Sequence, residues 1–437
     1  MRFPFLRAQL VHRGLASAIT HATAMLLAIS VTLVLARTLG SSAYGIYSYV
    51  FVVVCLLAIP AQFGLPRLVV RETARAHAAA EWPILKGFWR WAGLIALSGS
   101  ILLALLSAIA AWLFADAFSS TQLASFAWGL ALLPLLVLGR LRGAALRGLQ
   151  HVVAGQMPDT VIRPAILVLA VLALAFTTET ALTASVAMAL HVGSAAAAFI
   201  AGAILLWRAQ PTEIYTATPR FRARQWTAAA IPMGITTGML LINQQADIVL
   251  LGFFVTADEV GVYRVAAQAA MLVAFGLQVV NLVASPQFSR LYTRGERRQL
   301  QRLAVLCARA SLAIALPVAL VFIAFGQPLL AFVVGQEYVS GSIALAILAI
   351  GQLVNAGMGP VVLLLDMTGH ERIVTRTVTI ASVGNILANL VLIPLFGLNG
   401  AAIASAATFV FWNTMLARAV KQRLGIHCTP FHSPRAS

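Results

Sequence analysis

Charged side chains are scarce in this chain of 437 residues. They make up 10% of the sequence, whereas about a quarter of the residues of a soluble globular domain are charged. Hydrophobic residues make up 61%. This composition excludes an ordinary soluble fold and predicts that lipid surrounds most of the chain. Its length is therefore best counted in membrane-spanning segments of about 20 residues each.

Cysteine is nearly absent as well. The three cysteines, Cys55, Cys307 and Cys428, are far apart in the sequence, so neither a disulfide framework nor a metal site is indicated. The sequence also has no Walker loop, nucleophile elbow or cluster of zinc ligands. We therefore expect a protein that is not an enzyme and that binds neither metal nor cofactor.

Long apolar runs dominate what is present. Twelve of them are long enough to cross the hydrocarbon core as helices, and strands that alternate apolar and polar residues are absent. The sequence therefore predicts an all-α integral membrane protein with about twelve transmembrane helices. The runs lie at Gly14–Ala36, Tyr44–Gly64, Trp91–Phe114, Leu123–Leu138, Ile162–Phe176, Ala181–Trp207, Ala228–Phe253, Val262–Phe288, Cys307–Phe325, Ile343–Leu365, Thr375–Phe396 and Ala401–Ala417.

Basic residues fall mainly on one side of these spans. Lys and Arg number 30 against 13 Asp and Glu, and only Arg37 and Arg264 lie at helix ends that we place outside. Because an excess of Lys and Arg marks cytoplasmic loops, we predict that both termini are cytoplasmic. The net charge of +17 is then a topology signal that also attracts anionic lipid, and no nucleic acid partner is expected.

Two stretches of the sequence share one pattern of residues. LGSSAYGIYS at Leu39–Ser48 and LGFFVTADEVGVYR at Leu251–Arg264 both have Leu-Gly followed by Gly-x-Tyr, and both lie where an odd-numbered span leads into the next. The chain is therefore predicted to form two six-helix halves, residues 1–210 and 220–437. The glycines permit tight turns, and the tyrosines are expected to anchor at the lipid headgroups. Repeated halves are typical of transporters.

The segments around these stretches resemble a known family, the polysaccharide and O-antigen flippases of the Wzx type. These belong to the multidrug/oligosaccharidyl-lipid/polysaccharide (MOP) exporter superfamily. The resemblance is carried by Leu35–Ala74 (LARTLGSSAYGIYSYVFVVVCLLAIPAQFGLPRLVVRETA) and Ala246–Gln268 (ADIVLLGFFVTADEVGVYRVAAQ), and by the segment from LLDMTGHER to NGAAIASA. It implies two bundles of six helices that form a V around a central cavity, as in the MATE multidrug exporters of that superfamily.

The resemblance also implies a function. It suggests translocation of an undecaprenyl-pyrophosphate-linked oligosaccharide across a bacterial inner membrane, for surface polysaccharide such as the O-antigen of lipopolysaccharide. The implied partners are this lipid-linked oligosaccharide, membrane lipid, and a polysaccharide polymerase and glycosyltransferases.

One acidic residue, Asp247, lies deep within a span. Such a residue is costly unless it is paired or functional, so a role in proton or cation coupling is one interpretation. A structural ion pair with Arg264 or Arg37 is the other. Asn243 and Gln244 precede Asp247 on the same predicted helix and complete the candidate ion-coupling set.

Arginine and amide side chains are the candidates for substrate binding. A guanidinium group binds phosphate oxygens through paired hydrogen bonds, which suits a pyrophosphate. Anchoring of cytoplasmic loops explains the arginines equally well, and hydrogen bonds between helices are the commoner role for amides in spans. The candidates are Arg71, Arg140, Arg147, Arg163, Arg264, Gln268, Gln278 and Asn281.

Two other transporters remain as alternatives. An ion-coupled multidrug exporter of the MATE type would carry cationic drugs, which an arginine-rich interior suits badly. MATE exporters also often have a carboxylate in the first span, and Gly14–Ala36 contains none. A peptidoglycan-precursor flippase would be expected to have arginine within that span and fourteen spans. The sequence therefore favours the oligosaccharide flippase.

Overall fold

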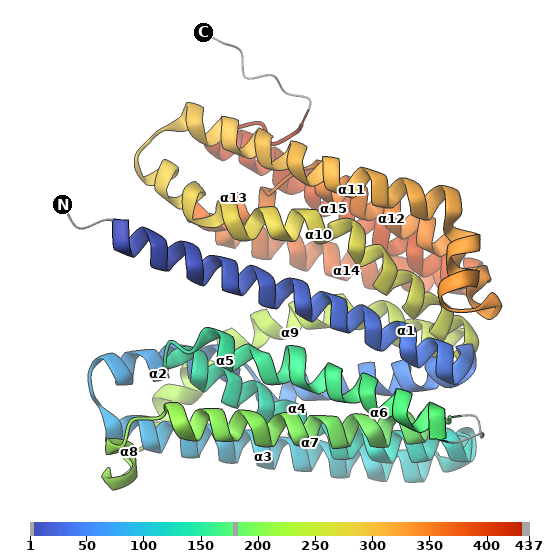
Figure 1. The fold of residues 1–437 in the computed structure, drawn as a ribbon, viewed down its shortest axis with the longest axis horizontal. Helices are drawn as coiled ribbons and strands as arrows, with labels where there is room; N and C mark the ends of the chain where they lie inside the picture. Colours follow the sequence, from blue (N-terminus) through green and yellow to red (C-terminus); the bar gives the residue numbers. More distant parts are fainter. Residues whose placement is uncertain (1–3, 178–181, 431–437) are drawn as a thin grey trace. The chain divides into compact units, whose positions relative to one another are not determined.

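The first two predicted spans form one helix with a single break. The computed structural model describes residues 4–177 and 182–430, apart from the side chains of residues 4–19, 21, 235–236, 239–244, 282 and 286. Helix α1, Pro4–Gln62, contains both runs and breaks at Gly40, where φ is 76°. Because glycine adopts this conformation without steric strain, the first Leu-Gly of the repeat is where the chain turns back on itself (Figure 1).

The described part of the chain is helical throughout and contains no β-strand. After α1 come α2 (Leu65–Ala78), α3 (Trp82–Leu113), η1 (Ala115–Ala117), α4 (Ser120–Gly148), α5 (Val152–Met157), η2 (Pro158–Ile162), α6 (Arg163–Thr177), α7 (Ala184–Ala209) and α8 (Glu213–Thr216). The remaining elements are α9 (Ala223–Phe254), α10 (Ala257–Thr293), α11 (Arg297–Val333), η3 (Gln336–Gly341), α12 (Ser342–Gly357), α13 (Val361–Met367), α14 (Glu371–Phe396) and α15 (Leu398–Leu424).

Ten helices of the described residues are long and apolar enough to cross a membrane. Division of α1 at Gly40 and the addition of α9 account for all twelve predicted runs. Large side chains on α3 such as Leu94 and Trp112 are 65% and 76% exposed, which is expected only for a surface that faces lipid. The prediction of an all-α membrane protein is therefore confirmed.

The tenth predicted run is not continuous. It was expected to span Ile343–Leu365 as one helix, but the structure divides it into α12 and α13. Gly359 between them has φ of 73°, and Pro360 has no N–H with which to continue the helix. A Cβ at Gly359 would lie 2.8 Å from the Cβ of Ala308, so the break also brings this turn against α11.

The chain divides into two compact units. The N-terminal unit comprises Ile19–Gln245, and the C-terminal unit comprises Met1–Ala18 with Ala246–Ser437. The boundary at Gln245 therefore falls within α9. The division into halves at 1–210 and 220–437, which rests on the internal repeat, stays a prediction.

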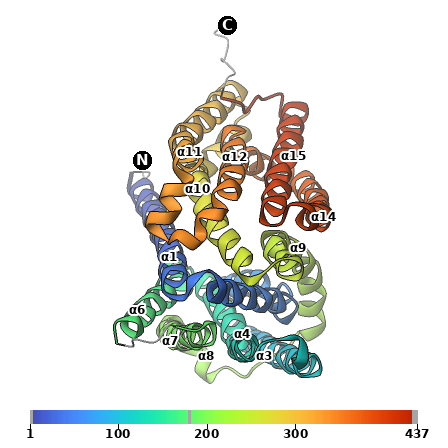
Figure 2. The same cartoon turned by 90° about the vertical axis from the view of Figure 1, so that its right-hand side faces the viewer.

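Close helix contacts build the N-terminal unit, in which α4 packs along α7 (Figure 2). The start of α2 meets α9 at two glycines, since a Cβ at Gly64 would lie 2.4 Å from the main-chain nitrogen of Gly234. A Cβ at Gly143 in α4 would similarly lie 2.4 Å from the main-chain oxygen of Gly155 in α5. These glycines let helix backbones touch, as is common in membrane proteins.

The C-terminal unit has a core at one end of its bundle. Phe288, Leu300 and Leu365 are buried there together with Ile426, which follows α15. Gln301 holds this last segment in place, because its Nε2 donates to the main-chain oxygen of His427 at 2.7 Å and its Oε1 accepts from the His427 N–H at 2.8 Å. The segment directly after α15 thus becomes part of the bundle.

Candidate functional site

Asp247 is bound by side chains from three other helices of the C-terminal unit. The Tyr263 hydroxyl on α10 donates to Oδ2 at 2.9 Å, and Nδ2 of Asn389 on α14 donates to Oδ1 at 2.8 Å. Ser405 on α15 also donates to Oδ2. The carboxylate therefore joins α9, α10, α14 and α15 at one point.

A chain of amides and hydroxyls continues from this carboxylate. Asn389 also donates to Oδ1 of Asn385 one turn earlier, at 3.1 Å, and Asn385 donates to the Thr408 hydroxyl at 3.2 Å. The spacing of four residues places Asn385 and Asn389 on one face of α14, as the sequence predicted. A separate group on α12 and α15 links Gln352, Asn355 and Asn413 by hydrogen bonds of 3.1 and 3.0 Å.

Neutral polar groups bind Asp247. Among the described residues of its own unit, it forms no ion pair with a basic side chain, so the predicted pair with Arg264 is not found. The other predicted pair, with Arg37, joins residues of different units and stays a prediction. Hydroxyl and amide groups bind a carboxylate without neutralising it. A carboxylate held in this way within a span is suited to take up a proton or a cation. Asn243 and Gln244, the other members of the ion-coupling set, lie outside the described residues.

Four predicted substrate-binding residues share α10, and the structure brings none of them to the carboxylate. Arg264 and Gln268 are half-buried and Gln278 is exposed. Asn281 is half-buried, and its buried Oδ1 accepts no hydrogen bond from the described residues. The neighbour of Arg264 in sequence, Tyr263, is the α10 residue that binds Asp247.

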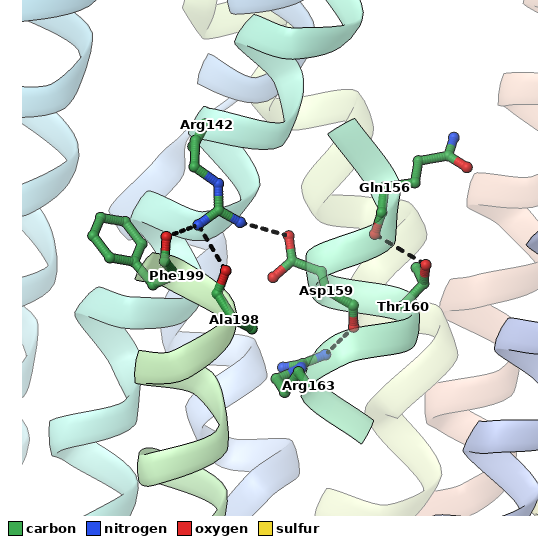
Figure 3. Close-up of polar contacts among 7 residues, drawn as sticks. All are labelled: Arg142, Gln156, Asp159, Thr160, Arg163, Ala198 and Phe199. Atoms are coloured by element: carbon green, nitrogen blue, oxygen red, sulfur yellow. Dashed lines mark hydrogen bonds and ion pairs between the residues drawn. The ribbon is translucent and has the colours of Figure 1, made fainter. Parts of the chain in front are cut away.

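Arg142 is the most buried arginine of the described chain, and its place in the sequence, after the fourth predicted span, indicated a loop anchor and a phosphate contact equally. Its side chain is 5% exposed and crosses from α4 to α7, where Nη1 donates to the main-chain oxygens of Ala198 at 3.2 Å and Phe199 at 2.6 Å (Figure 3). The guanidinium also lies 5.2 Å from the centre of the Phe199 ring, a cation–π distance.

Asp159 is the carboxylate nearest to this guanidinium, with Oδ2 3.9 Å from Arg142 Nη2. The spacing of four residues between Asp159 and Arg163 would also allow an ion pair along the helix. In the structure, Arg163 donates to the main-chain oxygen of Asp159 at 3.4 Å, so its contact is with the helix backbone (Figure 3). Arg147 lies within electrostatic range of Asp159, with its side chain over Gly155. The predicted Arg147 and Arg163 are thus brought together, with Arg142 as a third arginine.

The structure places the two other predicted arginines of this unit on α2 and α4. Arg71 on α2 is exposed and donates from Nε and Nη2 to Oε1 of Glu72, at 3.1 and 3.0 Å. Glu72 is buried and also binds Arg75 at 3.1 Å. Arg140 is half-buried on α4.

The tyrosines of the repeated motif are not headgroup anchors. Tyr47 and Tyr263 are 5% and 2% exposed, and each binds an ionisable residue of its own unit. The Tyr47 hydroxyl lies 2.7 Å from Nδ1 of the buried His191 on α7, as the Tyr263 hydroxyl binds Asp247. The repeat therefore places a buried hydroxyl at the corresponding position of both halves.

The architecture is similar to that of several solved membrane transporters. An inward-facing multidrug resistance MATE family transporter of the MOP superfamily matches with a TM-score of 0.71 over 92% of this chain and 94% of that one, at 12% identity. The lipid II flippase MurJ in an inward closed conformation matches with a TM-score of 0.68 over 93% of this chain and 87% of MurJ, at 14% identity. The protein is therefore a multi-pass membrane protein with the MOP-superfamily fold.

The sequence comparison narrows this class to a family. The family described as polysaccharide biosynthesis protein matches residues 34–342, and the chain belongs to it. The probable low-salt glycan biosynthesis flippase Agl15 of Haloferax volcanii is 29% identical over 173 residues, which are 39% of this chain and 36% of Agl15. An uncharacterized membrane protein of Methanocaldococcus jannaschii is 27% identical over 174 residues, 39% of this chain and 34% of that protein. Each match thus spans about a third of the relative's length.

Proposed function

We propose that this protein is a flippase that moves an undecaprenyl-pyrophosphate-linked oligosaccharide from the cytoplasmic to the outer leaflet for surface polysaccharide synthesis, such as that of O-antigen. The family match over residues 34–342 carries the proposal. A similar protein supports it, because Agl15 is named a probable low-salt glycan biosynthesis flippase.

The arginines of the N-terminal unit are the proposed contacts of the pyrophosphate. Their guanidinium groups offer paired donors to phosphate oxygens at the end of the spans that we place in the cytoplasm. The polar residues of α10 are the proposed contacts of the sugar chain, whose hydroxyls accept and donate hydrogen bonds. The full set is Arg71, Arg140, Arg147, Arg163, Arg264, Gln268, Gln278 and Asn281.

Asp247 is the proposed coupling residue, with Asn243 and Gln244 before it on α9. Its carboxylate is bound by neutral groups, so uptake of a proton or a monovalent cation changes the net charge of the network. In an alternating-access cycle, such a change favours one conformation of the transporter over another, and an ion gradient then drives the cycle in one direction.

The alternative cargoes fit the chain less well. Solved MATE transporters share its fold, but a likeness at 12% identity does not extend to the substrate. A cationic drug would be repelled by three arginines gathered near one carboxylate. Peptidoglycan precursor remains the second candidate, because its pyrophosphate would suit the same arginines.

The protein is a multi-pass membrane protein, and we propose that it lies in a bacterial inner membrane with both termini in the cytoplasm. A polysaccharide polymerase and glycosyltransferases would be its partners in synthesis. Cysteine introduced at the exposed Thr256 should react with an impermeant reagent added from outside, whereas cysteine at the exposed Arg222 should not.

Complementation tests the cargo. The gene is expressed in a strain that lacks its own polysaccharide flippase, and surface glycan is measured by staining. Export should be restored by the wild type and reduced by Arg147→Ala or Arg163→Ala, because each lost charge-assisted contact costs about 1.5–3 kcal/mol when desolvated. Arg222→Ala and Arg298→Ala, at exposed positions, are the controls. Normal membrane levels without surface glycan in any matching strain would overturn the proposal.

A further inference from the structure

Positive charge is in excess around Asp159. Arg142 lies 3.9 Å from this single carboxylate, Arg163 binds the main-chain oxygen of the same residue, and Arg147 lies within electrostatic range of it. The three arginines come from α4 and from the start of α6. All lie in helices long and apolar enough to cross a membrane, where an uncompensated charge is unfavourable. Two positive charges thus remain without a carboxylate of their own in this cluster.

Two nitrogens of Arg142 have no hydrogen-bond acceptor in the described part of the chain. Nε and Nη2 are both buried, and Nη2 lies beyond hydrogen-bond distance of Asp159, at 3.9 Å. Nη1, by contrast, is bound by two main-chain oxygens. Buried donors without an acceptor are rare in native proteins because each costs about 1–3 kcal/mol. Such donors on a side chain that is 5% exposed require a functional explanation.

The backbone holds Asp159 at this distance. Asp159 lies in η2, a π-helix over Pro158–Ile162 in which the N–H of Arg163 donates to the oxygen of Pro158. Single π-turns within α-helices are frequent at functional sites. The Asp159 side chain is 28% exposed, so it has room to move away from Arg142.

Two glycines make the space in which the charged groups lie. A Cβ at Gly202 on α7 would lie 2.2 Å from Cζ of Arg142, and a Cβ at Gly139 on α4 would lie 3.2 Å from Oδ1 of Asp159. Any larger residue at Gly202 would displace the guanidinium. The space for the guanidinium is therefore made by a glycine on α7, and the space for the carboxylate by a glycine on α4.

We infer that this cluster, Arg142 with Arg147, Arg163 and Asp159, is a binding site for the phosphate groups of the lipid-linked substrate, in which Asp159 occupies the place of the anion. The inference rests on the proposed function and adds to it a further binding residue, Arg142, and a competitor, Asp159. A pyrophosphate has more oxygens and more charge than a carboxylate, so it binds the unpaired donors of Arg142 and moves Asp159 aside.

This arrangement also explains how substrate leaves. Because Asp159 returns to the arginines when the phosphate departs, the three guanidinium groups are not left without an anion. The carboxylate therefore weakens binding and speeds release. A purely structural ion pair would act differently, since loss of Asp159 would then leave ligand affinity unchanged.

Binding to the purified full-length protein in nanodiscs tests the inference. Undecaprenyl pyrophosphate is the probe, and its affinity is measured by native mass spectrometry for the wild type, Asp159→Asn and Arg142→Gln. Asp159→Asn removes the competing carboxylate and should raise the affinity for the probe about 10-fold. Arg142→Gln removes the guanidinium and should lower this affinity about 10-fold. Asp116→Asn and Arg222→Gln, at exposed positions of the same unit, are matched controls and should bind as the wild type does.

Three further ligands identify what is recognised. Undecaprenol, which has no phosphate, should show no difference between the wild type and Asp159→Asn. The affinity for phosphatidylglycerol and for inorganic pyrophosphate should rise less than about 2-fold from the wild type to Asp159→Asn. An equal gain for either would overturn the assignment to a lipid-linked pyrophosphate, because a bilayer phosphate or a free anion would then be the ligand.

Unchanged affinity in Asp159→Asn overturns the inference even if Arg142→Gln fails to fold. Complementation keeps this outcome separate from the proposed function. If the wild type restores surface glycan and Asp159→Asn binds as the wild type does, the inference alone fails. If the wild type binds the probe but exports no glycan, the proposed function fails.

Discussion

Each compact unit of the protein holds a carboxylate within a membrane-spanning helix, and the two carboxylates have opposite surroundings. Asp247 in the C-terminal unit is bound by a tyrosine, an asparagine and a serine. Asp159 in the N-terminal unit has three arginines near it and no hydrogen bond from Arg142. Asp247 is thus held firmly by hydrogen bonds from neutral groups, which do not neutralise its charge. Asp159 has more positive charge near it than its own negative charge, but it is held loosely.

This difference assigns different ligands to the two units. A carboxylate bound by neutral donors is stabilised when it takes up a proton or a cation. An arginine cluster with a displaceable carboxylate is stabilised when it binds an anion. A transporter that couples an ion to an anionic cargo needs both kinds of site.

The largest expected effect follows from neutralising Asp247. Asp247→Asn keeps the shape of the side chain but can no longer change its charge, so export should fall at least ~10-fold, within the usual range for coupling between sites. Surface glycan is measured by staining, and membrane levels of the protein by immunoblot. Asp116→Asn, at an exposed loop position, should export normally. A collapse of membrane levels in Asp247→Asn would show that the residue is structural.

A double-mutant cycle tests whether Arg142 and Asp159 act as a pair. Asp159→Asn leaves the buried guanidinium without its nearest carboxylate and should lower stability by ~1–3 kcal/mol, while Arg142→Gln with Asp159→Asn should recover part of that loss. Thermal unfolding in detergent measures both. Additive effects of the two changes would mean that 3.9 Å is too long for a significant interaction.

A glycine pair on α7 tests the packing of the arginine. Gly202→Ala would place a methyl group 2.2 Å from the Arg142 guanidinium and should destabilise the protein by ~1–3 kcal/mol. Gly193→Ala on the same helix meets no atom within 4 Å and should be neutral or slightly stabilising. Equal melting temperatures for the two variants would show that the guanidinium moves without resistance.

The smallest expected effect compares the two repeated tyrosines. Tyr47→Phe and Tyr263→Phe each remove one buried hydroxyl, so each should lower stability by about 1 kcal/mol. Only Tyr263→Phe is expected to change the ion dependence of export, since only Tyr263 binds the proposed coupling residue. A similar change in Tyr47→Phe would contradict the division of roles between the units.

Hydropathy was sufficient to predict the fold, because every long helix in a membrane needs a run of apolar residues. Asp247 was also found from sequence, as the one acidic residue deep in a span. Its binding to Tyr263 and Ser405 was missed, because a tyrosine near a span end suggests a lipid interface and a lone serine carries no signal.

The burial of Arg142 was missed for a related reason. Near the end of a span, a buried arginine and a topology-setting arginine look the same in sequence, and only the packing of α4 against α7 distinguishes them. One signal was available, since Pro158 and Pro164 lie on either side of Asp159 and interrupt the regular hydrogen bonding of a helix. That pattern suggests an irregular turn at a charged residue within an apolar run.

The π-turn at Pro158–Ile162 also has a consequence for the helix that follows it. A helix that takes in one additional residue rotates everything after it by about 100° around the axis. Gly155 faces α4 before the turn, and Leu167 and Val171 form the buried side of α6 after it. The direction in which the buried side of α6 faces is therefore set independently of the direction in which α5 faces α4. One segment can thus press its backbone against α4 and still direct an apolar side to the lipid along the rest of its length.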